Sequence, residues 1–193
     1  MTFLDLLLSK IWGPSSQWFW IMVQSLIILA TACFIYYQVR LQRYSNMLQT
    51  LNEMRSFWNN EKMMNFRLKV CETYLTGAKS IGAAEAEVLG FFEEIGLLLK
   101  KHVLQKDVVW NTYSYFIEYY WTMLEENIKE YRKTTGDETW YENFEYLNES
   151  MREYSLKRKS PYGGKTHDEI KAFIDSEREL GELIISKASS GQI

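Results

Sequence analysis

The 193-residue chain contains few of the residues from which catalytic and metal sites are most often built. Two cysteines exclude a disulfide scaffold and a four-cysteine zinc site, and two histidines exclude a histidine-rich metal cluster. The phosphate-binding patterns GxGxxG and GxxxxGK do not occur, and neither do HExxH, CxxC and GxSxG. A formal charge of −3 gives no general attraction to nucleic acid. We therefore expect a protein that is not an enzyme and that uses no metal, cofactor or small-molecule substrate.

Proline is also scarce, and its distribution indicates the fold class. The chain has two prolines, and none falls between residues 15 and 160. No stretch alternates apolar and polar residues as a half-buried strand does, whereas apolar residues recur three or four positions apart. The sequence therefore predicts an all-α protein: an N-terminal transmembrane helix that continues into a stalk, followed by a cytoplasmic helical bundle.

The one long apolar run lies near the N-terminus. Residues 18–39 contain no Asp, Glu, Lys or Arg over 22 positions, and a helix of that length measures about 33 Å, enough for a hydrocarbon core of about 30 Å. Aromatic rings at both edges suit the two membrane interfaces. A buried helix of a soluble ligand sensor is the alternative. The residues assigned to the span and its edges are Trp18, Trp20, Gln24, Ser25, Thr31, Tyr36, Tyr37 and Arg40.

Basic residues around this run predict its orientation. The N-terminal flank holds only Lys10, whereas Arg40, Arg43 and Arg55 follow the run. Because positive flanks stay in the cytoplasm, we expect a single-pass protein of the inner membrane with its C-terminal domain in the cytoplasm.

Four parts follow along the chain, separated by breaks in the helical pattern. They are a short amphipathic segment at 1–14, the transmembrane helix and stalk at 15–59, the helical bundle at 60–187 and a flexible tail at 188–193. Breaks inside the bundle predict helices over 61–75, 83–103, 107–131 (capped by Asp107), 138–158 and 166–187. Side chains expected inward include Phe92, His102, Ile117, Trp140 and Phe173.

Some polar and small residues of the bundle have a structural and a functional interpretation. Gly90 and Gly96 are expected to allow close helix packing, and Glu94 and Glu118 could face each other across two helices. A di-metal carboxylate bundle would also need Glu-x-x-His, and His102 has no glutamate three residues before it. Solvated helix faces are therefore the better interpretation of these carboxylates.

Two groups of residues are candidates for interactions with other molecules. The stalk and the aromatic run 110–121 provide a predicted oligomer interface, which consists of Tyr44, Leu48, Leu51, Met54, Tyr119 and Trp121. A basic cluster near the end of the 138–158 helix could contact RNA or another anion, or could simply be a solvated helix end. Its candidate residues are Arg152, Lys157, Arg158 and Lys159.

A ribonuclease of the HEPN type is the alternative function. Such enzymes place an arginine four to six residues before a histidine, so that both reach one phosphate. No arginine stands at that distance before His102, and Arg158 is separated from His167 by eight residues. Arg152 with His167 is the pair that would have to act, which leaves the enzyme without a well-placed general base.

Three consecutive segments resemble a known kind of protein. They read WIMVQSLIILATACFIYYQVRLQR, SNMLQTLNEMRSFWNNEKMMNFR and VLGFFEEIGLLLKKHVLQKDVVWNTYSYFIEYYW, of which FFEEIGLLLKK is the most specific part. Over roughly residues 16–155 the chain resembles a bacterial family of uncharacterised single-span membrane proteins with a cytoplasmic helical domain. The plan is also similar to the membrane accessory proteins of type VI CRISPR systems. These resemblances imply a homo-oligomer in the bilayer that forms a pore or binds a cytoplasmic protein or ribonucleoprotein, in antiviral defence or stress.

Overall fold

The computed structural model describes residues 17–163 and 165–189, with side chains up to residue 183. Every regular element within those limits is an α-helix, so the predicted all-α class is confirmed. The helices are α2 (Gln17–Trp58), α3 (Glu61–Thr76), α4 (Ala83–Lys100), α5 (Lys106–Thr135), α6 (Glu142–Lys157) and α7 (His167–Ser189). The chain divides into two compact units, residues 1–50 and 51–193, and each is described by itself. The predicted segment at 1–14 and most of the predicted tail lie outside the described residues.

The described part of the first unit is one uninterrupted helical segment. Helix α2 continues from the apolar run into the predicted stalk over 42 residues, a length of about 63 Å. It is long and apolar enough to cross a membrane, and none of its apolar window is buried. The hydroxyls of Ser25 and Thr31 donate to the carbonyls of Ile21 and Ile27 at 2.8 Å, so neither is an unsatisfied polar group in the apolar run.

Asn59 and Asn60 separate α2 from α3, at the predicted boundary between the stalk and the bundle. The Asn60 side chain caps α3 by accepting from the Met63 backbone N–H at 2.7 Å. At the other end, Gly77 adopts φ +72°, and its N–H donates to the Tyr74 carbonyl at 3.0 Å. Both ends of α3 therefore follow from the short-range capping signals that the sequence carries.

Three helices differ from the prediction at their ends, and at α4 and α6 local turns replace an expected helical end. Helix α4 ends at Lys100, and His102 leaves it at φ +57° with its side chain exposed, not inward. Helix α5 is capped at Gln105, and Asp107 lies in its first turn. Helix α6 begins at Glu142, because the Asp137 carboxylate accepts from the backbone and hydroxyl of Thr139 and forms a turn.

Trp140 lies in that turn, and its predicted inward position is wrong. Its side chain is 41% exposed, and its ring meets Tyr131 edge-on at 5.3 Å. Phe92, Ile117 and Phe173 are buried as predicted.

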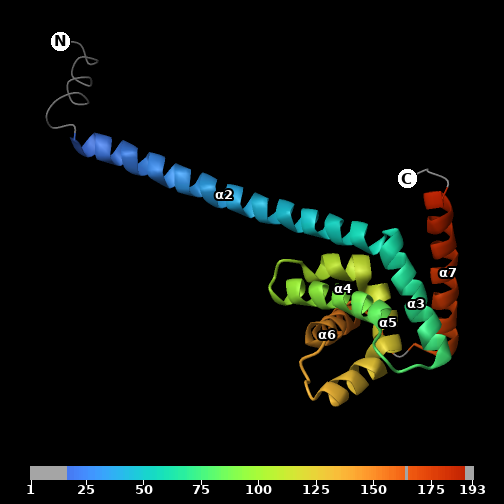
Figure 1. The fold of residues 1–193 in the computed structure, drawn as a ribbon. Helices are drawn as coiled ribbons and strands as arrows, with labels where there is room; N and C mark the ends of the chain where they lie inside the picture. The colour runs from blue at the N-terminus through green and yellow to red at the C-terminus, as the bar shows by residue number, and fades with distance from the viewer. Residues whose placement is uncertain (1–16, 164, 190–193) are drawn as a thin grey trace, which may run out of the picture. The chain divides into compact units, whose positions relative to one another are not determined.

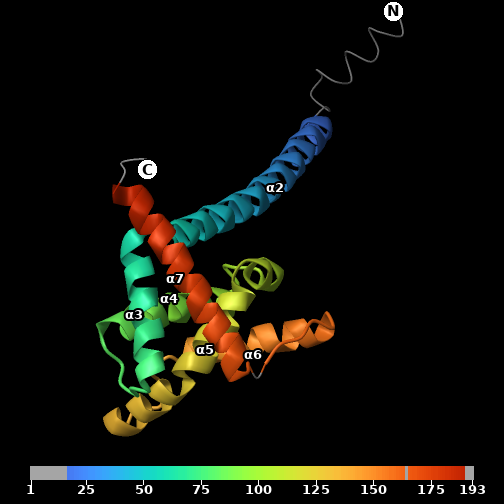
Figure 2. The ribbon, with the colours of Figure 1, turned by 90° about the vertical axis from the view of Figure 1, so that its right-hand side faces the viewer.

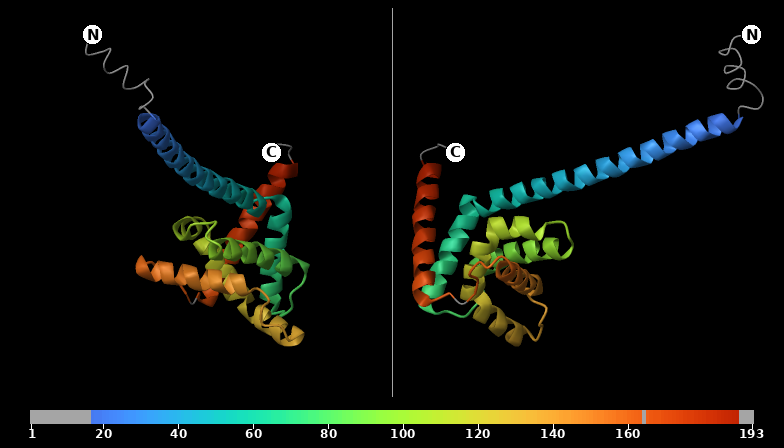
Figure 3. Two further views of the ribbon diagram at one scale, coloured as in Figure 1. Left: turned by 90° about the vertical axis from the view of Figure 1, so that its left-hand side faces the viewer. Right: turned by 180° about the vertical axis from the view of Figure 1, so that it is seen from behind.

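The second unit packs its helices around an aromatic core. Helices α3 and α7 lie side by side and antiparallel, whereas α4 packs on α6 and on α3, and α5 packs on α6 (Figures 1, 2 and 3). At the end of α2, the Trp58 ring stacks on Phe91 at 4.6 Å and meets Phe116 and Tyr120 edge-on. Trp58 therefore holds the end of α2 to α4 and α5.

Candidate functional site

The most polar buried feature of the bundle is an ion pair between α3 and α7. Arg67 and Glu177 are both buried, and the guanidinium donates to both carboxylate oxygens, from Nε at 2.8 Å and from Nη2 at 2.5 Å. The hydroxyl of Tyr120, from α5, donates to the same carboxylate at 3.0 Å. Bidentate geometry with a third donor satisfies the charges that burial would otherwise penalise.

The same guanidinium also holds the end of α2. Its Nη1 donates to the Trp58 carbonyl at 3.3 Å, and its plane lies 4.3 Å from the Trp58 ring centroid. One arginine therefore connects the last residue of the long helix to α7, the last helix that the structure describes.

The electrostatics of this cluster favour fixed protonation states. Burial alone would lower the pKa of Arg67, yet the neighbouring Tyr120 and Glu177 leave that pKa above its ordinary value. Burial, followed by the Glu177 charge, raises the pKa of Tyr120 well above its ordinary value and that of Cys71 to about 12. These groups are closed to solvent, and their hydrogen bonds are directed at one another, so the cluster stabilises the bundle.

A second polar cluster fixes the segment before α7. The buried Glu118 carboxylate accepts from the backbone N–H of Gly163 and from Lys165 Nζ, the latter at 3.1 Å. The Tyr162 hydroxyl donates to Asn148 at 2.9 Å, and burial raises the pKa of Tyr162. The idea that Glu118 faces Glu94 is wrong, because Glu118 turns toward this segment while Glu94 is exposed.

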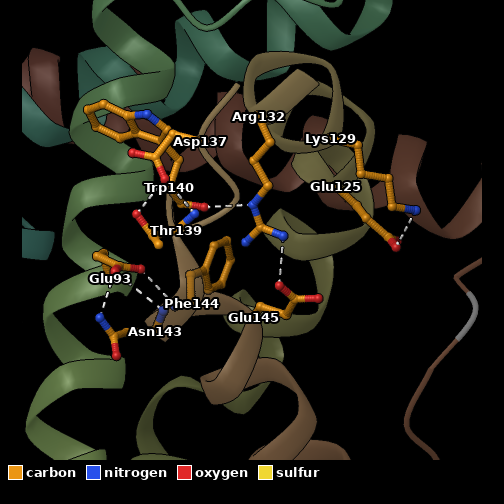
Figure 4. A network of polar contacts seen from close by, with 10 residues as sticks. All are labelled: Glu93, Glu125, Lys129, Arg132, Asp137, Thr139, Trp140, Asn143, Phe144 and Glu145. Carbon is orange, nitrogen blue, oxygen red and sulfur yellow. Dashed lines mark hydrogen bonds and ion pairs between the residues drawn. The ribbon is translucent and has the colours of Figure 1, made fainter. Parts of the chain in front are cut away.

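A third cluster connects α4 to the beginning of α6 (Figure 4). The Glu93 carboxylate accepts from the backbone N–H of Asn143 at 3.3 Å and of Phe144 at 2.8 Å, and from the Asn143 side chain at 2.7 Å. A carboxylate from one helix thus caps the positive end of another. Beside it, Phe92 stacks on Phe144 at 4.8 Å.

Gly96 completes this contact because any Cβ there would overlap the backbone carbonyl of Asn143. The FFEEIG segment is thus explained by helix packing, and the predicted role of Gly96 is confirmed. The prediction for Gly90 is wrong: its face of α4 is exposed, and a Cβ there would have no neighbour within 4 Å.

The predicted oligomer residues lie in different environments. Tyr44 and Leu48 are exposed on α2, whereas Leu51 and Met54 are buried within the second unit. Tyr119 is only 8% exposed and stacks on Phe173 at 4.5 Å. The sixth residue, Trp121, is half-buried and meets Phe144 edge-on. Three of the six residues therefore offer little surface to a second subunit, namely Leu51, Met54 and Tyr119.

The predicted basic residues all lie on the surface. Arg152, Lys157 and Lys159 are exposed, and Arg158 lies 5.0 Å from the ring centroid of Trp110 and 5.1 Å from that of Tyr154. The residues predicted for the span are on α2, where Trp18, Tyr36 and Tyr37 expose more than half of their surface.

The histidines are not brought together with the candidate arginine. His102 follows α4 and His167 begins α7, and both are exposed. Over residues 17–163 and 165–189, no hydrogen bond or ion pair joins either histidine to Arg152, and no group of three His, Cys, Asp or Glu could hold a metal.

The sequence carried a signal for the Arg67–Glu177 pair that composition alone does not show. Arg67 falls between Met63, Met64 and Val70, Cys71, and Glu177 lies on the same face of α7 as Phe173 and Ile174. A charged residue on an otherwise apolar face of each of two helices indicates a buried pair.

Comparison with known proteins gives the family of the chain. Residues 25–151 match the model of a family described as a domain of unknown function, DUF4760. The chain belongs to this family. The DUF4760 region begins inside the apolar part of α2 and ends in α6, so it contains Arg67 and Glu93 but not Glu177. No match to the chain was found among curated proteins or among solved structures.

Proposed function

We propose that this DUF4760 protein is a single-span, membrane-anchored module without enzymatic activity, which self-associates and binds a cytoplasmic partner. The observation that carries the proposal is the exposed apolar surface of α2. Large apolar side chains cover that helix over residues 18–39, and none of the apolar window is buried. Such a surface is unfavourable in water and requires a bilayer or other helices to cover it.

The contacts of the bundle support binding rather than catalysis. The buried charges of Arg67, Glu118 and Glu177 are directed at partners inside the bundle, where they join helices. Large apolar side chains also remain exposed outside the apolar run 18–39, at Phe57 and Leu156. A bundle that pairs these three buried charges internally and exposes apolar residues is suited to contacts with other proteins.

Membrane attachment is tested by carbonate washing of membranes that contain the full chain. The wild type should stay in the pellet, and Ile28→Arg combined with Leu29→Arg should move it to the soluble fraction. Each arginine at the centre of a span costs about 2.5–3.5 kcal/mol. Leu75→Arg, at an exposed position of the bundle, is the matched control and should leave the protein in the pellet. If carbonate releases the wild-type protein into the soluble fraction, the proposed membrane anchor is wrong.

Orientation and self-association need separate measurements. A cysteine at the exposed Thr134 should react with an impermeant maleimide only after the cells are opened, if the bundle is cytoplasmic. Cys71 is buried and Cys33 lies in the proposed span, so neither should react. Light scattering in detergent at micromolar concentration should give a mass above that of one chain, and a monomer contradicts self-association without affecting the anchor.

A further inference from the structure

An open groove runs along the first two-thirds of α4. It has a volume of about 480 Å³ and is called the α4 groove below; its lining residues are Phe57, Ala83, Ala86, Glu87, Gly90, Phe91 and Glu94. Gly90 lies inside a helix, where glycine costs about 1 kcal/mol relative to alanine, yet no atom of the chain would contact a Cβ there. Packing within the chain therefore does not explain this glycine, and the space beside it is open to another molecule.

The chemistry of the groove is apolar on the floor and acidic on the rim. Phe91 is buried and stacks on Phe57, which stays 44% exposed, with ring centroids 6.1 Å apart. Glu87 and Glu94 lie two turns apart on the same side of α4, about 10.5 Å along its axis. Both are exposed, and within the described parts of the chain neither takes part in an ion pair. The groove therefore suits an apolar side chain flanked by two positive charges.

The end of α6 presents that arrangement on the same unit. Leu156 is 62% exposed and is followed by a run of three bases; residues Leu156, Lys157, Arg158 and Lys159 are called the basic knuckle. Lys157 and Lys159 are exposed, and no residue of the described ranges forms an ion pair with them.

Other contacts hold the basic knuckle in one shape. The guanidinium of Arg158 lies against Trp110 and Tyr154, and Trp110 Nε1 donates to Ser155 Oγ at 2.6 Å. These contacts fix the end of α6 that carries Leu156 and the two lysines, so its backbone does not have to be ordered on binding, which lowers the entropy cost.

We propose that the basic knuckle of one copy docks into the α4 groove of a second copy. Leu156 fills the space over Gly90, and Lys157 and Lys159 pair with Glu87 and Glu94. The beginning of α4 and the end of α6 lie on opposite sides of the bundle in Figures 2 and 3, so one copy cannot satisfy its own groove. Different surfaces meet in this contact, and such head-to-tail contacts build closed rings or open filaments. The inference rests on the proposed self-association and assigns its surfaces.

Charge reversal on the full-length chain in detergent tests the contact. Glu87→Lys with Glu94→Lys should lower the association constant at least tenfold, because each groove then repels the knuckle. Lys157→Glu with Lys159→Glu should do the same, and the four substitutions together should restore association. Misfolding cannot produce that rescue. Glu130→Lys with Lys133→Glu, at exposed positions of α5, is the matched control and should leave the mass unchanged.

Cross-linking distinguishes contacts within and between copies. In a Cys33→Ala background, one tagged copy carries Gly90→Cys and a second, of different size, carries Leu156→Cys. A disulfide between the two sizes supports the proposal. A third variant carries both Gly90→Cys and Leu156→Cys, and a disulfide that forms only within this chain, and not between the two sizes, overturns the proposal. Glu130→Cys in place of Leu156→Cys is the control, and a cross-link to Gly90→Cys of equal yield also overturns the proposal.

The remaining outcomes separate this inference from the proposed function. An oligomer that persists in both charge-reversal variants overturns the contact and leaves self-association standing. The charge-reversal variants of the basic knuckle are also tested for binding to a single-stranded RNA and to phosphatidylglycerol vesicles. If they lose that binding while the oligomer is unchanged, the contact between copies is overturned in favour of an anionic ligand. A monomeric wild type that stays in washed membranes contradicts both self-association and the contact, but not the anchor.

Discussion

Removing one charge of the Arg67–Glu177 pair is expected to separate α7 from the bundle. Arg67→Met deletes two hydrogen bonds to Glu177 and the contact to the Trp58 carbonyl, and it leaves the buried carboxylate with the Tyr120 hydroxyl as its remaining donor in the cluster. Breaking a buried pair in this way costs about 3–5 kcal/mol. Because domains of this size are stable by about 5–15 kcal/mol, that loss is a large fraction of the total. Arg67→Met with Glu177→Leu should recover most of the stability, since both charges are then gone.

Hydrogen exchange of the full chain in detergent is the assay, because it reports on each helix separately. Peptides from α7 and α3 should lose protection in Arg67→Met, while peptides from the middle of α2 should not change. Glu125→Gln breaks the exposed pair with Lys129, whose atoms are 2.8 Å apart, and should leave the protection of all helices nearly unchanged. A loss below about 1 kcal/mol in Arg67→Met, or a double variant no better than the single one, would refute the reasoning.

Three further predictions concern α4 and the buried thiol. Gly96→Ala should destabilise the bundle by about 1–3 kcal/mol, because the new methyl group overlaps Asn143. Gly90→Ala should stabilise it by about 0.5–1 kcal/mol, because alanine favours the helix and meets no neighbour there. Equal unfolding midpoints of the two variants in denaturant would contradict this contrast. Glu93→Gln should cost about 1 kcal/mol and loosen the beginning of α6 in hydrogen exchange, and unchanged protection there would count against the cap. Burial, followed by Glu177, raises the pKa of Cys71 from 9.0 to about 12, so the unfolded thiol ionises first and folding stability falls as the pH rises from about 9 to about 12. Cys71→Ala should flatten that fall by about 1.4 kcal/mol per pH unit, and identical slopes in the two proteins would show that the thiol does not contribute.

The order of the helices was predictable because local signals set it. The charge-poor run 18–39, the cap at Asn60 and the left-handed Gly77 act within a few residues, and the structure has α2 and α3 where they predict them. The boundaries that failed depend on local turns that periodicity does not show. The apolar stripe continues through Trp140, but the turn made by Asp137 delays α6 until Glu142.

The buried polar contacts were harder to predict because their partners are far apart in the chain. Arg67 and Glu177 are 110 residues apart, and Glu118 and Gly163 are 45 residues apart. One sequence shows that a charged residue interrupts an apolar face, but not which charge will meet it. The pair also crosses the end of the DUF4760 region, since Arg67 lies inside that region and Glu177 beyond it.

Helix α4 combines two glycines with opposite surroundings, and this contrast separates a packed face of the helix from an open one. Around Gly96, the packed Phe92 ring, the Glu93 cap and the adjoining backbone of Asn143 hold α6 in place. Around Gly90 the helix is open, lined by an exposed aromatic ring and bordered by carboxylates. A glycine within a helix weakens it unless close contact compensates, and of the two glycines Gly90 and Gly96 it is Gly96 that has such a contact within its own chain. Packing within the chain explains Gly96 but leaves Gly90 open, and the exposed, basic end of α6 in a second copy is the occupant that we propose for that open face.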